Sequence, residues 1–106
     1  MLNSAPVNLS DSQKKYLRGL GHRLKPVITV GEAGLSGPVL KEFESTISHH
    51  ELIKVRVRAP DREARDSIID DLCRQGAADL VQRIGNVALI YRRNPDEPGL
   101  RLPGYS

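Results

Sequence analysis

Two glycines three residues apart, Gly31 and Gly34, mark the stretch of this sequence that is best suited to binding a phosphate group. The β-branched run KPVITV (residues 25–30) precedes them, and Ser36 follows, placed to cap a helix with Pro38 in its first turn. Glycines let the backbone approach a ligand closely, and a helix N-terminus offers free N–H groups and a partial positive charge. The stretch is therefore either a phosphate cradle made of backbone amides or an ordinary turn from strand to helix.

Basic side chains gather on one face of the helix expected over residues 10–23. Ser10 and Gln13 fit a capping box at its start. The leucines that recur at helical spacing, and that we expect to be buried, are Leu17, Leu20 and Leu24. The face away from them carries no acid, and its basic residues are Lys14, Lys15, Arg18 and His22. Charges of one sign repel each other unless a negative partner meets them, so this face either binds a polyanion or is simply solvated.

The strand expected over residues 51–58 alternates between apolar and basic side chains. The apolar residues, expected to face the core, are Ile53, Val55 and Val57. The residues of the opposite face are all positive: Lys54, Arg56 and Arg58. Charges on an exposed strand also protect it from edge-to-edge association, but mixed signs would do this equally well. The basic row therefore has two interpretations, protection of the strand or contact with a polyanion.

The run His49-His50-Glu51 contains residue types that bind metal ions. Neighbouring residues on a helix point about 100° apart, and the sequence places no further ligand at a suitable spacing. No nucleophile, base and orienting group recur at a recognisable spacing either. We therefore expect no catalytic site, no metal and no other cofactor.

Composition restricts the class of protein further. The chain has 106 residues, enough for one domain with a modest core, and its single cysteine, Cys73, excludes an intrachain disulfide. No apolar run reaches the length of a membrane span, and the first eight residues lack the features of a secretory signal. We expect a cytoplasmic protein without a membrane partner or a small-molecule substrate.

The formal net charge is +3, and its distribution along the chain is uneven. Residues 10–35 contain five Lys and Arg against two acids, whereas residues 61–75 contain five acids against three arginines. A helix is expected over residues 61–75, and we expect its acidic surface to turn away from any polyanion. Two strands, residues 80–84 and 87–92, follow it and are joined by the hairpin turn Gly85-Asn86.

With its elements in this order, the chain resembles the stand-alone bacterial YhbY family, the single-domain form of the CRM domain (chloroplast RNA splicing and ribosome maturation). The resemblance covers about residues 9–92. It rests on the fragments LS (9–10), LGHRLKP (20–26), GEAGL (31–35), HHELIKV (49–55) and IGN (84–86) leading to LIYR (89–92).

The resemblance implies a fold similar to the C-terminal domain of the third bacterial translation initiation factor. It also implies RNA binding, association with the precursor of the large ribosomal subunit and, in plant relatives, intron splicing. Carried over by position, the RNA-binding loop consists of Gly31, Glu32, Ala33 and Gly34. The inner positions of this loop are often basic or polar in the family, whereas here an acid stands beside the expected phosphate, which is unfavourable. We therefore expect the loop to act through its backbone.

We predict a single α/β (α+β) domain of the order α-β-α-β-α-β-β, with a four-stranded mixed sheet and the helices packed on one side. The domain is expected over residues 9–93, between a flexible N-terminus (1–8) and a flexible tail rich in proline and glycine (94–106). The predicted function is binding of ribosomal RNA in the precursor of the large subunit, without catalysis. Aromatic residues are too scarce for a platform that stacks single-stranded bases. The alternative is a DNA-binding or general nucleic-acid-binding module without a ribosomal role, although no helix-turn-helix or zinc spacing is present.

Overall fold

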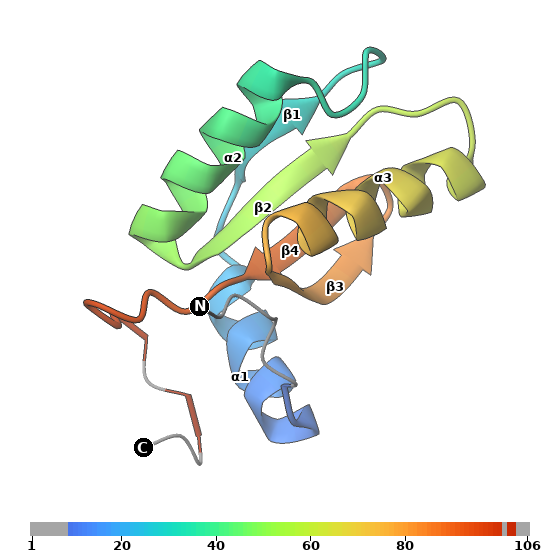
Figure 1. Cartoon of the computed structure of the whole chain (residues 1–106). Coiled ribbons are helices and arrows are strands. Elements are labelled where there is room, and N and C mark those ends of the chain that lie inside the picture. Colours follow the sequence, from blue (N-terminus) through green and yellow to red (C-terminus); the bar gives the residue numbers. More distant parts are fainter. Residues whose placement is uncertain (1–8, 101, 104–106) are drawn as a thin grey trace.

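The seven helices and strands of the computed structural model follow one another in the order that the sequence predicts (Figure 1). Their bounds are α1 (Asp11–Gly21), β1 (Pro26–Val30), α2 (Gly37–His50), β2 (Leu52–Val57), α3 (Arg62–Gln75), β3 (Asp79–Ile84) and β4 (Val87–Tyr91). The structure describes residues 9–100, 102 and 103. The predicted flexible N-terminus and residues 101 and 104–106 of the predicted tail lie outside the described residues. The single α/β domain and the order of its elements are confirmed.

The sheet is mixed, as predicted, and its strand order is β1-β2-β4-β3. β1 and β2 are parallel because α2 carries the chain back across the sheet between them. β4 is antiparallel to both of its neighbours, β2 and β3, and the turn Gly85-Asn86 closes the β3–β4 hairpin with a positive φ at Gly85. The sequence left this strand order open.

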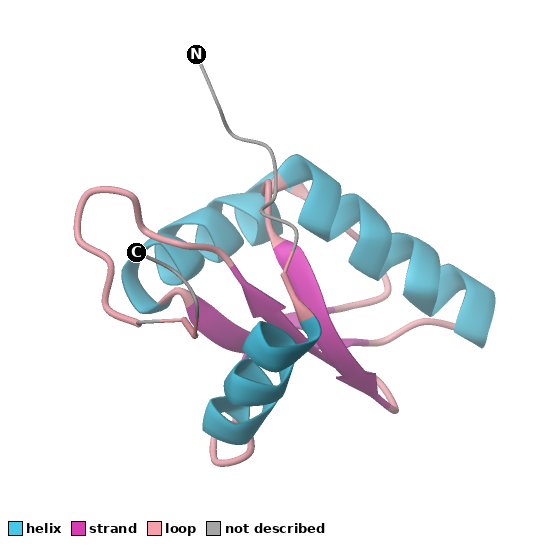
Figure 2. Ribbon diagram, turned by 90° about the horizontal axis from the view of Figure 1, so that it is seen from below, coloured by secondary structure: helices cyan, strands magenta, loops and turns pink. Residues whose placement is uncertain are grey.

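Apolar side chains cover both faces of the sheet, so the prediction that the helices pack on one side is wrong for α1. The first core lies between the sheet and the helices α2 and α3, and it contains Phe43, Val55 and Ile69. The second lies between the opposite face and α1, and it contains Leu17 and Leu89. Figure 2 shows α1 on the other side of the sheet from α2 and α3. The physical reason is in β4, where the unbroken run VALIY turns apolar residues to both faces.

α1 begins with the predicted capping box. Fewer of its leucines are buried against the sheet than their spacing predicts. The Gln13 N–H donates to Ser10 Oγ (3.2 Å) and the Ser10 N–H donates to Gln13 Oε1 (2.9 Å). Leu17 is buried, but the predicted burial of Leu20 and Leu24 is wrong, since they are 39% and 37% exposed. The sheet-facing position one turn after Leu17 is Gly21, where a Cβ atom would lie only 2.6 Å from a methyl carbon of Leu89.

A buried carboxylate holds the segment that follows β4. Glu51 caps α2 with a φ of +64° and is almost completely buried. Its carboxylate accepts hydrogen bonds from the N–H groups of Asn94 (2.7 Å), Gly99 (2.8 Å) and Leu100 (2.9 Å). Leu102 then packs into the second core. The composition of the tail did not indicate the contacts that residues 94–100 and 102 make with Glu51 and the second core. The domain boundary at residue 93 and the flexibility of the tail stay predictions.

Candidate nucleic-acid interface

The glycine loop is a compact turn between β1 and α2. The Gly34 N–H donates to the carbonyl of Gly31 (3.0 Å), and Gly34 has a φ of +76°, a conformation that favours glycine. Gly31 has no positive φ, and a Cβ atom added there would meet no atom within 4 Å. The fold therefore requires a glycine at position 34 but not at position 31. Because Gly31 has no side chain and no neighbouring atoms, it leaves open space on the loop for a ligand.

The helix start beside this loop has fewer free amides than the sequence suggests. Ser36 caps α2, as predicted, and its Oγ accepts the hydrogen bond of the Val39 N–H (3.4 Å). Pro38 has no N–H. Among the first three residues of α2, only Gly37 keeps an amide that a ligand could use. The loop amides of Glu32 and Ala33 point to no acceptor among the described residues, so the available cradle is centred on the loop itself.

A hollow next to the loop brings Glu32 together with Arg58 and Asn86. Two backbone hydrogen bonds fix this arrangement, from the Arg58 N–H to the Val30 carbonyl (2.9 Å) and from the Val57 N–H to the Asn86 carbonyl (2.8 Å). β2 ends at Val57, so the prediction that Arg58 belongs to the strand is wrong by one residue. The charge of Arg58 matters for the loop, because a positive side chain that lines the same hollow as Glu32 reduces the repulsion between this acid and a phosphate.

The other two residues of the basic row, Lys54 and Arg56, lie on the face of the sheet opposite α2 and α3. They line a hollow together with Gln82 and Ile84 of β3, and no acid is among the residues that line it. α1 leaves this part of the face uncovered, since Arg56 is exposed and Ile84 is 69% exposed. Alternate residues of a strand are about 6.6 Å apart. The row therefore leads along β2 from the vicinity of α1 to the glycine loop.

The predicted basic face of α1 is present, but it does not join the hollows on the sheet. Lys15, Arg18 and His22 are exposed and Lys14 is half-buried. None of the four lines either of these hollows or a third one, beside Lys54, that Leu20 lines. Leu20 is about 200° around the helix from Arg18. Sequence reasoning instead missed residues that surround Lys54: Arg23, Lys25 and His50. Arg23 and Lys25 directly follow the basic face of α1 in the sequence and are part of the excess of positive charge in residues 10–35.

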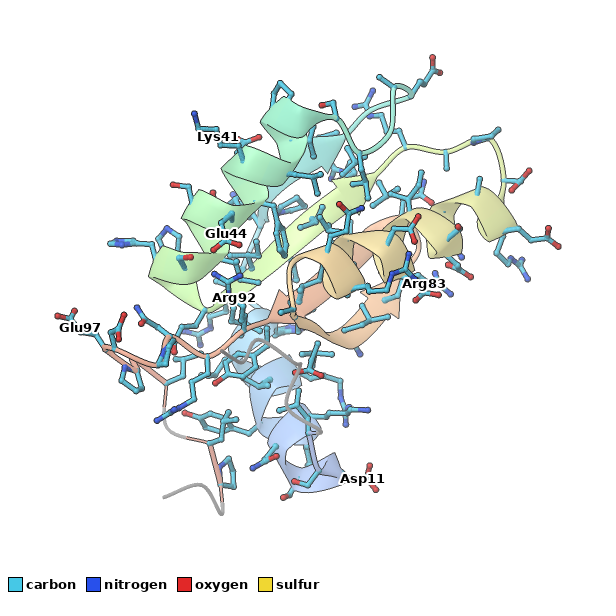
Figure 3. The ribbon with its side chains drawn as sticks, viewed as in Figure 1. Asp11, Lys41, Glu44, Arg83, Arg92 and Glu97 are labelled. Carbon is cyan, nitrogen blue, oxygen red and sulfur yellow. The ribbon has the colours of Figure 1, made fainter. Side chains whose placement is uncertain are left out.

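The acids lie mainly on the two helices of the other layer. Asp66 of α3 pairs with Arg65 (3.1 Å) and with Arg83 of β3 (3.4 Å), and Glu44 of α2 pairs with Arg92 (2.6 Å). Figure 3 shows Arg83 beside α3 and Arg92 beside α2. The acidic helix α3 is thus on the opposite side of the sheet from α1, Lys54 and Arg56. The two layers of the molecule carry charges of opposite sign.

Cys73, His49, His50 and Glu51 are the described residues whose types suggested a nucleophile or a metal ligand. Burial raises the pKa of Cys73 to about 12, so its thiol is protonated and a poor nucleophile at neutral pH. The side chains of His49 and His50 meet edge to face, while Glu51 turns inward to the segment after β4. Across residues 9–100, 102 and 103 no three potential ligands come together as a metal site would require.

These features define a small α/β domain with a basic face and a glycine loop at one end of it. The chain belongs to the CRS1/YhbY (CRM) domain family, whose model matches residues 9–92. The family is non-enzymatic. In the described part of the chain, none of the helices has the length and apolar character that crossing a membrane demands.

Individual relatives agree with this assignment over almost the whole chain. A "Probable RNA-binding protein" of Pseudomonas aeruginosa is 48% identical, over 92% of this chain and 93% of its own. An "RNA-binding protein" of Haemophilus influenzae is 44% identical, over 92% and 97%. The solution structure of a hypothetical protein of Staphylococcus aureus superposes with a TM-score of 0.78 at 31% identity, covering 91% of this chain and all of the other.

Proposed function

We propose that this protein binds structured RNA and that its partner is ribosomal RNA in the precursor of the large ribosomal subunit, where it acts in the cytoplasm as an assembly factor. The observation that carries the proposal is the basic row Lys54, Arg56 and Arg58, which leads along β2 to an open glycine loop while the acids lie on the opposite layer. The descriptions of the relatives as RNA-binding proteins support the partner class.

Binding would begin with capture of phosphates by the basic row, because neutralised phosphates release their condensed counterions. The amides of the glycine loop would then hold one phosphate in a fixed position, and such contacts set register without reading sequence. Phe43 and Tyr91 are buried in the two cores, and Tyr16 lines neither hollow on the sheet. Recognition would therefore depend on the shape and backbone of a folded RNA more than on stacking of unpaired bases.

The test replaces Lys54, Arg56 and Arg58 with Gln and measures affinity for a large-subunit ribosomal RNA fragment over a range of salt concentrations. If all three contact phosphate, the slope of log affinity against log salt becomes shallower by about two units, since each lost contact removes roughly 0.7 to 0.9. The matched control removes the same charge from exposed residues of α2 and α3, namely Lys41, Arg62 and Arg74. This control should leave the slope unchanged.

Two outcomes would contradict the proposal. Equal losses in both triple variants would mean that net charge alone attracts the RNA, and no particular face binds it. Competition by duplex DNA as effective as that by the ribosomal RNA fragment would favour a general nucleic-acid-binding module. Crosslinking the protein in cells and sequencing the attached RNA tests the ribosomal assignment directly, because large-subunit sequences should dominate.

A further inference from the structure

A second hollow on the α1 side of the sheet has an aliphatic floor and a basic rim. It lies where the end of α1, the starts of β1 and β2 and the segment after β4 meet. The floor consists of Leu20, Leu24, Val27, Leu52 and Leu100. The rim consists of Arg23, Lys25, His50 and Lys54.

This hollow holds a large share of the exposed apolar surface of the described residues. Leu20, Leu24 and Val27 are 39%, 37% and 54% exposed, and they are three of the six large apolar residues with comparable exposure. Tyr16, a fourth member of that group, lies one turn before Leu20 on the same flank of α1. Scattered exposed leucines are ordinary, but apolar residues gathered in one hollow with a polar rim mark an interaction surface.

The charge of the rim restricts what can cover the floor. All four rim residues are basic or histidine, and no acid of the described part of the chain lines the hollow. A partner that buries the floor therefore brings aliphatic side chains flanked by carboxylates. Among residues 9–100, 102 and 103, those that line the hollow include no Phe, Tyr or Trp on which an RNA base could stack, whereas an aliphatic side chain would bury apolar surface on this floor.

We propose that this hollow docks an acidic amphipathic segment of a partner protein, with leucine-type side chains on the floor and Asp or Glu side chains against the rim. This surface is additional to the RNA-binding face and shares only Lys54 with it. One wall is held in place before any partner arrives, because the Glu51 carboxylate accepts the hydrogen bonds of the Gly99 and Leu100 N–H groups (2.8 and 2.9 Å). A preformed wall reduces the ordering cost of binding.

The test uses a synthetic helical peptide of roughly 16 residues, with Leu on one face and Glu on the rest, titrated into the isotopically labelled full chain. The backbone amide signals of Leu20, Leu24 and Val27 should shift on binding. A control peptide with Lys in place of every Glu should bind at least about tenfold more weakly, because the rim then repels it.

Variants of the floor locate the binding site. Leu20→Gln combined with Val27→Thr preserves helix and strand propensities and should weaken binding of the acidic peptide by about tenfold or more. The matched control is Ile84→Thr, which alters a residue that is 69% exposed but lies outside this hollow, and it should bind the peptide like wild type. Thermal unfolding of each variant verifies that the fold is intact.

The same variants distinguish this proposal from its competitors. Unchanged peptide affinity in the floor variant would overturn it. So would a loss of RNA affinity in that variant with peptide binding intact, which would assign the hollow to RNA. Self-association of wild type that the floor variant abolishes, without peptide binding by either protein, would assign it to a second copy of the chain. Peptide binding by a wild-type protein that fails to bind RNA would disprove the proposed function and leave this surface standing.

Discussion

Single polar side chains hold segments of this molecule that are far apart in the sequence. The guanidinium of Arg92 donates to both carboxylate oxygens of Glu44 (2.7 and 2.6 Å) and to the carbonyl of Gly76 (2.9 Å). It therefore joins the end of β4 to α2 and to the end of α3. The sequence contains both partners of the ion pair, but nothing in the local pattern brings together residues 48 positions apart.

The pair of Glu44 and Arg92 predicts a pH-dependent contribution to stability. Hydrogen bonding to Arg92 lowers the pKa of Glu44 below its ordinary value of 4.5. A lowered pKa in the folded state adds stability above the ordinary value, and this stability is lost as the pH falls through the lowered pKa. Glu44→Gln should therefore reduce the free energy of unfolding at pH 7, by less than about 1 kcal/mol because Glu44 is partly exposed and screened.

Urea unfolding from pH 7 down to acid measures this effect. The difference between wild type and Glu44→Gln should shrink as the pH falls below 4.5 and then vanish. The control is Glu42→Gln, which changes an exposed carboxylate on the same helix and should shift stability little at any pH. A difference between wild type and Glu44→Gln that stays constant with pH would show that the ion pair does not contribute.

The two loop glycines should respond differently to substitution by alanine. Gly31→Ala adds a methyl group to open space at an ordinary φ, so stability should be unchanged or slightly raised. Its affinity for RNA should nevertheless fall if the backbone approaches a phosphate there. Gly34→Ala forces an alanine to a φ of +76° and should cost about 1 kcal/mol of stability. Wild-type RNA affinity in Gly31→Ala would remove the loop from the interface.

At the scale of the elements, periodicity in the sequence was a good guide to where helices and strands lie and a weaker guide to what each one faces. The predicted caps at Ser10 and Ser36 are confirmed, and Asp61 caps α3 in the same way, because a cap depends on residues within one turn. The buried side of α1 was only partly predicted. The contact of α1 with Leu89 depends on Gly21. A glycine has no apolar side chain, so a search for apolar residues at helical spacing does not detect it.

The basic flank of α1 can be tested separately from its buried side. Replacing Lys14, Lys15 and Arg18 with Gln keeps helix propensity nearly constant and leaves Leu17 untouched, so stability should hardly change. If these residues contact phosphate, affinity should fall for every RNA, and the salt slope should become shallower by about two units. A slope identical to that of wild type would mean that this flank only meets water. The comparison with the β2 triple variant then shows whether one RNA contacts both surfaces.

At the scale of the whole molecule, the sheet separates a basic layer from an acidic one. The uneven charge along the chain predicted this separation, since bases gather in residues 10–35 and acids in residues 61–75. The sequence did not show which side of the sheet each helix covers, because one apolar strand can turn side chains to either face. The residues around Lys54 come from three separate parts of the chain, so only the folded structure reveals the hollow that they form.

The Glu51 carboxylate joins the end of α2 to the segment after β4, more than 40 positions away in the sequence. Glu51→Gln replaces one acceptor oxygen with an NH₂ group that faces N–H donors, and loss of these hydrogen bonds should lower the free energy of unfolding by roughly 1.5 to 3 kcal/mol. Hydrogen exchange at the amides of Gly99 and Leu100 should accelerate first. Glu97→Gln, in an exposed part of the same segment, is the control and should match wild type. Unaltered exchange at both amides would show that Glu51 does not hold this segment.

The second core also has a consequence for folding during synthesis, because its residues lie far apart in the sequence. α1 is made before the rest of the described domain, yet Leu17 packs with Val81, Leu89 and Leu102, which lie far downstream in the sequence. At about 5 to 20 residues per second, α1 waits roughly 4 to 17 seconds for these partners. Until these residues are made, Leu17 lacks three of the side chains that cover it in the folded domain. α1 precedes the other helices of the domain in the sequence and is nevertheless among the last of them to be packed.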